Sequence, residues 1–157
     1  MLPLSDPQWR EFAANYTDGA HVAALLARAE RGEEPHRWFD DLHQELLHQY
    51  TVSQAALPAA PHLARLAVPL KEARVDLLVL LGLCHAFLEP SLLQSVPPSI
   101  AQEWHSSARD GWILVAEELK NKQPDASHLL YLLSALAGLS GFPALARSIE
   151  GVDYEAE

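Results

Sequence analysis

The sequence predicts an all-α protein, and three observations support this. The chain of 157 residues is 49% hydrophobic, and its apolar content is mainly Leu and Ala, which favour helices. β-Branched and aromatic residues are sparse and never alternate over the length of a strand. Apolar side chains instead recur three or four positions apart, in segments separated by Pro and Gly. At this length we expect a single domain, residues 1–157, with its own core.

Residues 1–31 are expected to form two short helices that cap the fold. The first should reach about residue 16, and the second should run from residue 20 to residue 31, where a glycine follows. Small polar side chains that precede each helix can accept hydrogen bonds from its first free amides. These candidate caps are Ser5 or Asp6 for the first helix and Thr17 or Asp18 for the second.

The remainder predicts three antiparallel helix hairpins. The first joins two apolar-striped segments, HRWFDDLHQELLHQY and QAALPAAPHLARLA, through the short turn TVS, with Ser53 as the expected cap of its second helix. Residues 71–89 are apolar almost all round, as expected for a helix packed between neighbours. Glycines 138 and 141 are expected to close a later helix. Together the hairpins span residues 36–149, and the individual hairpins occupy residues 36–67, 71–121 and 124–149. The tail 150–157 is expected to fray.

A stack of helix pairs is the architecture of a short α-solenoid. The segment HQYTVSQAALPAAPHLARLA, followed by the charged and then leucine-rich run KEARVDLLVLLGLC, resembles bacterial HEAT-like repeat proteins. The resemblance covers about residues 36–88, and Tyr50 stands where the pattern has a small residue. It implies an α-solenoid fragment that binds other proteins, in an immunity-type or regulatory setting.

The four tryptophans are predicted to fill two roles. Trp38, Trp104 and Trp112 lie on apolar stripes, so we expect them in the core. Trp9 lies near the amino terminus and is the freest to dock elsewhere, for example on a second subunit. The alternative for all four is a ligand pocket or a partner contact, where tryptophan often contributes strongly to binding.

Charge and composition exclude several classes of partner. Eleven basic and 21 acidic side chains give a formal net charge of −10, which repels nucleic acids and anionic lipid headgroups. A basic protein partner fits this charge better. The longest uncharged apolar run, Leu77 to Cys84, is far shorter than the roughly 20 residues of a membrane span. With one cysteine and no leader pattern, a cytoplasmic location is expected.

Two groups of residues are candidates for chemical sites. His36, Asp40 and His43 would converge on one face of a helix, but they offer a divalent metal only three ligands. Cys84 and His85 are adjacent, so on a helix their side chains diverge by about 100° and form no catalytic pair. The sequence contains no nucleophile elbow and no glycine-rich phosphate loop. We therefore expect no enzymatic activity, no cofactor and no metal.

A binding function is the leading prediction. The turn between the first two predicted hairpin helices, with the acidic face beside it, is the candidate partner-binding surface. Its residues are Asp40, Asp41, Glu45, His48, Tyr50 and Thr51. Two alternatives stay open: a small molecule or a metal in a groove between helices, and self-association as a homodimer through apolar faces at 92–100 or 139–149.

Overall fold

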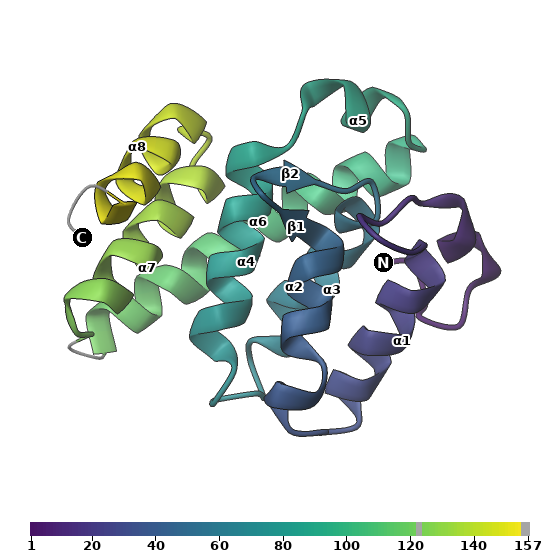
Figure 1. The fold of residues 1–157 in the computed structure, drawn as a ribbon, viewed down its shortest axis with the longest axis horizontal. Helices are drawn as coiled ribbons and strands as arrows, with labels where there is room; N and C mark the ends of the chain where they lie inside the picture. Colours follow the sequence, from purple (N-terminus) through teal and green to yellow (C-terminus); the bar gives the residue numbers. More distant parts are fainter. Residues whose placement is uncertain (122–123, 155–157) are drawn as a thin grey trace.

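The computed structural model describes residues 1–121 and 124–154, and it is mostly helical (Figure 1). Within this part of the chain, two 3₁₀ turns and one short β-hairpin accompany the α-helices. The prediction of an all-α protein is confirmed. In chain order the elements are η1 Pro7–Glu11, α1 Gly19–Glu30, η2 Pro35–Arg37, α2 Phe39–Leu46, β1 Leu47–His48, β2 Thr51–Val52, α3 Ala56–Leu66, α4 Arg74–Phe87, α5 Pro90–Gln94, α6 Pro98–Asn121, α7 Ala126–Leu139 and α8 Pro143–Tyr154.

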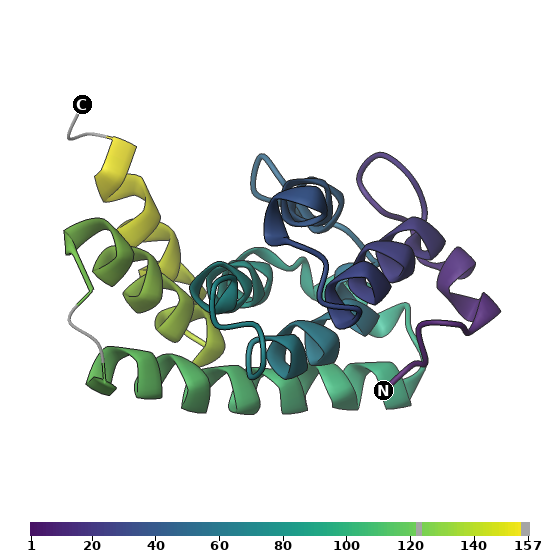
Figure 2. The same ribbon diagram turned by 90° about the horizontal axis from the view of Figure 1, so that it is seen from below.

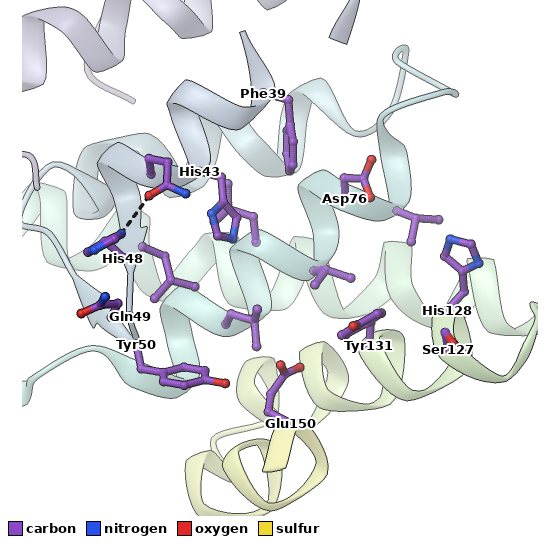
Figure 3. A pocket seen from close by; sticks show the side chains of 16 residues that line it. Phe39, His43, His48, Gln49, Tyr50, Asp76, Ser127, His128, Tyr131 and Glu150 are labelled. Carbon is purple, nitrogen blue, oxygen red and sulfur yellow. Dashed lines mark hydrogen bonds between the residues drawn. The ribbon is translucent and has the colours of Figure 1, made fainter. Parts of the chain in front are cut away.

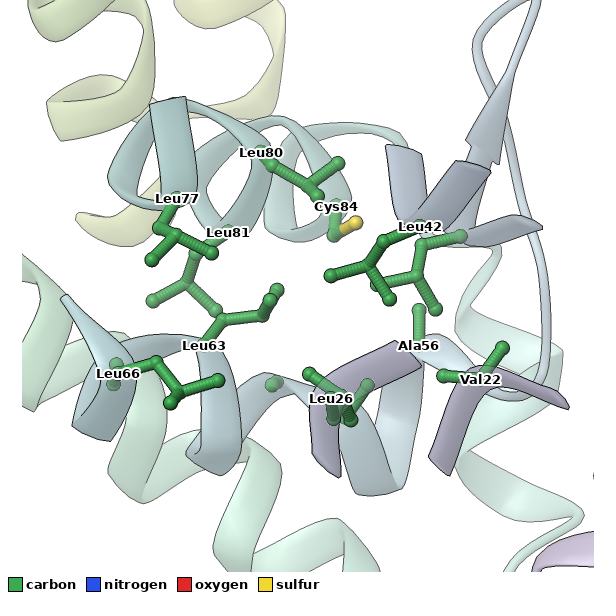
Figure 4. Packing of buried hydrophobic residues seen from close by; sticks show 14 of the residues in the cluster. Val22, Leu26, Leu42, Ala56, Leu63, Leu66, Leu77, Leu80, Leu81 and Cys84 are labelled. Atoms are coloured by element: carbon green, nitrogen blue, oxygen red, sulfur yellow. The ribbon is translucent and has the colours of Figure 1, made fainter. Parts of the chain in front are cut away.

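Helix α4 is the centre of the fold, because its apolar side chains face neighbours on several sides. It packs against α3, α6, α7 and α8, and Figure 4 shows its leucines meeting α1, α2 and α3 across one core. The long helix α6 runs beneath the other helices in Figure 2 and contacts α3, α4 and α7. A regular stack of three successive hairpins is not confirmed, since α6 spans the pairs instead of packing only with α4.

The amino-terminal segment departs from its prediction. Asp6 caps the first turn, accepting a hydrogen bond of 2.8 Å from the amide of Gln8, but the turn ends at Glu11. The chain then doubles back, so that the amide of Gly19 donates to the carbonyl of Phe12 (2.8 Å). The expected helix to residue 16 is therefore wrong. The second prediction is confirmed, with Asp18 as the cap of α1.

The tryptophans divide differently from the prediction. Trp38 and Trp104 are buried in the core as expected. Trp9 is also buried, only 1% exposed, and its indole N–H donates to the carbonyl of Pro3 (2.9 Å). Trp112 is 44% exposed on α6. Gly111, the residue before it, lies on the inner face of α6 against Leu81. Helical spacing predicted Trp112 on the buried stripe, but the stripe passes through Gly111, one position earlier.

A β-hairpin replaces the continuous helix expected up to residue 50. Helix α2 ends at Leu46, and β1 and β2 pair antiparallel through a two-residue turn. Gln49 and Tyr50 in this turn have φ values of 48° and 62°, as in the left-handed turns that join short hairpins. Asn-Gly usually marks such turns, so Gln-Tyr was no signal for one. Ser53 is not the cap of α3, because the helix begins three residues later.

Helices α4 and α7 cross at backbone contact. A Cβ added to Gly82 would lie 2.3 Å from Cα of Ala135, and one added to Gly138 would lie 2.3 Å from the carbonyl oxygen of Gly82. Gly138 therefore lies inside α7 and does not end it; Gly141, with φ +78°, follows the helix end. Helix α8 then continues to Tyr154, beyond the point where the tail was expected to fray, and residues 155–157 lie outside the described part.

None of the helices described here is long and apolar enough to cross a membrane.

His85 links α4 to α6 in a half-buried position. Its ring stacks on Trp104 with centroids 3.9 Å apart, and its Nε2 lies 3.3 Å from Oγ of Ser107. Burial, together with a smaller effect of nearby His105, lowers the pKa of His85 from 6.5 to about 3. The folded state thus holds the imidazole neutral.

Acid is therefore expected to destabilise the protein through His85. The pKa of His85 is lower in the folded state than in the unfolded chain, so the neutral imidazole stabilises the fold fully above about pH 6.5. This stabilisation is lost as the pH falls toward 3. Between pH 7 and about pH 4.5 the loss should be about 2–3 kcal/mol. Denaturant unfolding of the wild type and of His85→Phe across this range measures it. Between these two pH values, the free energy of unfolding of His85→Phe should fall by about 2–3 kcal/mol less than that of the wild type. Parallel pH profiles of the two proteins would contradict a lowered pKa of His85.

Candidate functional site

An open groove of about 1030 Å³ runs along one side of α4 (Figure 3). Its floor is apolar and comes mainly from Val75, Val79, Leu80 and Leu83 on α4. Helix α2 and the β-hairpin form one wall, and α7 and α8 form the other. The groove therefore lies between parts of the chain that are about 100 residues apart in sequence.

Polar side chains surround the apolar floor. His43 and His48 come from the wall formed by α2 and β1, His128 comes from α7, and the carboxylates of Asp76 and Glu150 come from α4 and α8. Among the described residues that line the groove, none is Lys or Arg. The fixed charges of the groove are thus negative.

A hydrogen-bond chain orients His48 at the rim. Its Nδ1 lies 2.8 Å from Oε1 of Gln44, and its Nε2 lies 2.8 Å from the hydroxyl of Tyr16. Because an amide oxygen only accepts, this assignment places a proton on Nδ1 of His48. In the neutral ring, Nε2 then accepts a hydrogen bond from the Tyr16 hydroxyl. Tyr16 and Gln44 hold the imidazole beside the groove.

Two titratable groups of the groove have shifted pKa values. Partial burial raises the pKa of Asp76, and the nearby Asp40 raises it further, while His128 opposes this shift. Burial lowers the pKa of His43, opposed by Asp40. Both shifts favour the neutral form. A cation that entered the groove beside Asp76 would offset the cost of holding its carboxylate in this setting.

The tip of the β-hairpin is fixed against the far end of α4. The ring of Tyr50 lies 4.7 Å from that of Phe87, and the guanidinium of Arg147 lies 5.0 Å from the same Phe87 ring. Arg147 also donates two hydrogen bonds to the carbonyl of Ala86 (3.0 and 3.2 Å). These contacts bring the hairpin and α8 together at the carboxyl end of α4.

The residues predicted to bind a partner are brought together only in part. His48 and Tyr50 line the groove, whereas Asp40, Asp41 and Thr51 are exposed outside it. The prediction for Glu45 is wrong, since it is 5% exposed. Its carboxylate accepts hydrogen bonds from the amides of Tyr16 and Thr17 (3.0 and 3.1 Å), and so it holds the returning amino-terminal segment in place.

The three residues considered for a metal do not form one site. The geometry assumed a single helix, but His36 lies in the separate turn η2 and its Nδ1 pairs with Glu34 at 3.4 Å. His43 instead faces the groove. Within the described residues, no three His, Cys, Asp or Glu side chains are placed to hold a metal ion.

Cys84 is buried in the core, and burial raises the pKa of its thiol to about 12. The reactive thiolate is therefore suppressed at neutral pH. We expect Ellman's reagent to label the single thiol of each chain rapidly in guanidinium chloride and at least about 100-fold more slowly in native buffer, because labelling then requires unfolding. Fast labelling of the native protein would contradict this burial.

Sequence reasoning missed four residues of the groove: Asp76, His128, Tyr131 and Glu150. They come from α4, α7 and α8, and no spacing within the sequence relates them. Only the crossing of α4 and α7 places them together. The apolar run of α4 hinted at a central helix, but it did not indicate that one side of this helix stays open.

No known protein family, curated protein or solved structure matches the chain significantly. The HEAT-like resemblance of residues 36–88 therefore has no support from a family match.

Proposed function

We propose that the protein is a non-enzymatic binding module that holds an amphipathic, basic helix of a partner protein in the groove along α4. The observation that carries this proposal is the combination of an apolar floor with carboxylates and no Lys or Arg among the described lining residues. Apolar side chains of the partner would cover the floor, and its cations would meet the carboxylates. A HEAT-like origin of the fold, as the resemblance implies, belongs to the same proposal.

The size of the groove favours a protein segment over a small molecule. Small-molecule pockets are usually about 300–1,000 Å³ and enclose most of the ligand. This groove is at the upper limit and open along its length. Two turns of helix, about 10 Å wide and 11 Å long, occupy roughly 850 Å³. The floor from Val75 to Leu83 spans about 12 Å of helix axis, which matches those two turns.

Selection from a displayed library of random 16-residue peptides tests the proposal. Peptides retained by the wild type and not by Val79→Arg, which blocks the floor, should be amphipathic and rich in Lys and Arg. Ile113→Arg is the matched control, because it adds the same charge at an exposed site on α6. In fluorescence polarisation, Val79→Arg should weaken binding at least about tenfold, a change of 1.4 kcal/mol, while Ile113→Arg stays within about twofold.

A second pair of variants covers the case in which Val79→Arg does not fold. Asp76→Lys changes an exposed rim carboxylate, and Asp110→Lys makes the same change on α6 outside the groove. Only Asp76→Lys should weaken the selected peptides, and added salt should weaken their binding to the wild type. The proposal fails if no peptide depends on the groove, if the selected peptides are acidic, or if both aspartate variants behave alike.

A further inference from the structure

The groove carries one carboxylate toward each end of its apolar floor. Asp76 lies in the first turn of α4. Glu150 belongs to the opposite end, because α8 is tied there by the hydrogen bonds of Arg147 to Ala86. Between them the floor is formed by apolar side chains alone.

The surroundings of Glu150 suit a cation. In Figure 3 its carboxylate lies between the rings of Tyr50 and Tyr131, which come from the hairpin tip and from α7. Aromatic rings beside a carboxylate attract ammonium and guanidinium groups through both the ring faces and the charge. All three side chains also have interactions within the chain.

The Asp76 end is built differently. Its carboxylate lies near His128 and close enough to Asp40 for the two negative charges to interact. Partial burial, more than the charge of Asp40, disfavours the ionised carboxylate and so favours the arrival of a cation. Phe39 lines the groove at the same end, and its ring lies 6.2 Å from that of His43.

We propose that the bound helix carries two cationic side chains seven positions apart on one face, one held by Asp76 and the other by Tyr50, Tyr131 and Glu150. Seven residues of helix advance about 10.5 Å and return close to the same face, which matches the span of the floor. This inference rests on the proposed function, because it specifies the occupant of the same groove.

Synthetic helical peptides of one composition test the spacing. Each has 16 residues of Ala, Gln, Leu and Lys, with leucines along one face and two lysines placed seven, five or three positions apart on its flank. The peptide with the seven-residue spacing should bind at least about tenfold more tightly than the others in fluorescence polarisation. Equal affinities overturn the inference, and so does failure of this peptide to bind.

A double-mutant cycle assigns each cation to its carboxylate. Replacing one lysine by norleucine should weaken binding about fivefold to the wild type and hardly at all to Glu150→Gln, whereas the other lysine should be coupled in the same way to Asp76→Asn. Glu117→Gln on α6, outside the groove, is the control. If library peptides need the groove but show neither the spacing nor the coupling, the two-cation inference is wrong while the binding function stands. If no peptide needs the groove, both are wrong.

Discussion

Arg74→Ala is expected to lower the free energy of unfolding by about 3–5 kcal/mol, the usual cost of removing one partner from a buried ion pair. Arg74 is 8% exposed at the start of α4, and its Nε lies 2.6 Å from Oε1 of Glu118, which is 5% exposed on α6. A second bond of 3.0 Å joins Nη2 to the more exposed Glu117. The variant would leave the buried Glu118 carboxylate without this cation.

Denaturant unfolding measures the effect, and two further variants separate its causes. Arg74→Met with Glu118→Leu removes both charges and keeps apolar volume, so it should recover most of the lost stability. Glu117→Gln should cost less than about 1 kcal/mol, because solvent screens that partner. Two results would contradict this account of the buried Arg74–Glu118 pair. One is a loss of unfolding free energy below about 1 kcal/mol for Arg74→Ala, and the other is a double variant that is as unstable as Arg74→Ala.

The sequence predicted the helices better than it predicted their packing. Caps and breakers act locally, so Asp18 and Gly32 marked real helix ends. At other positions, tertiary contacts determined the conformation of the backbone. The segment after η1 was expected to continue the first helix to about residue 16. Its backbone instead pairs with α2 and with the residue before α3, for example through the hydrogen bond from the amide of Ala55 to the carbonyl of Ala13 (2.9 Å).

The candidate site was harder to predict than the fold. Residues close in sequence, such as Asp40 and Glu45, looked like one surface, but Asp40 is exposed and Glu45 is buried, where it accepts hydrogen bonds from the amides of the amino-terminal segment. The alternative of apolar faces at 92–100 is not what the structure shows, since Leu92, Leu93 and Ile100 pack against the core. Phe142 and Leu145 remain exposed near the other face that the sequence indicated for a homodimer. Long-range packing, which no local pattern encodes, determines each of these outcomes.

Gly82 is the residue at which fold and groove depend on each other. It lets α4 and α7 approach until backbone meets backbone, and α7 carries His128 and Tyr131 on the groove wall. Any side chain at residue 82 would meet Cα, Cβ and O of Ala135 within 2.8 Å. Backbone atoms cannot rotate away as the end of a flexible side chain can. The two helices would therefore have to separate.

Gly82→Val is expected to destabilise the protein by about 3 kcal/mol or more, at the upper end of overpacking costs. Gly82→Ala should also destabilise it, although alanine alone favours a helix by about 1 kcal/mol. Gly151→Ala in α8 is the matched control, because nothing lies within 4 Å of its added Cβ; it should be neutral or stabilising. Unfolding by denaturant gives the magnitudes, and amide exchange should rise more in α7 and α8 than in α3, since the groove wall loosens first. A stable Gly82→Val with unchanged exchange in α7 would show that the close crossing does not hold this wall.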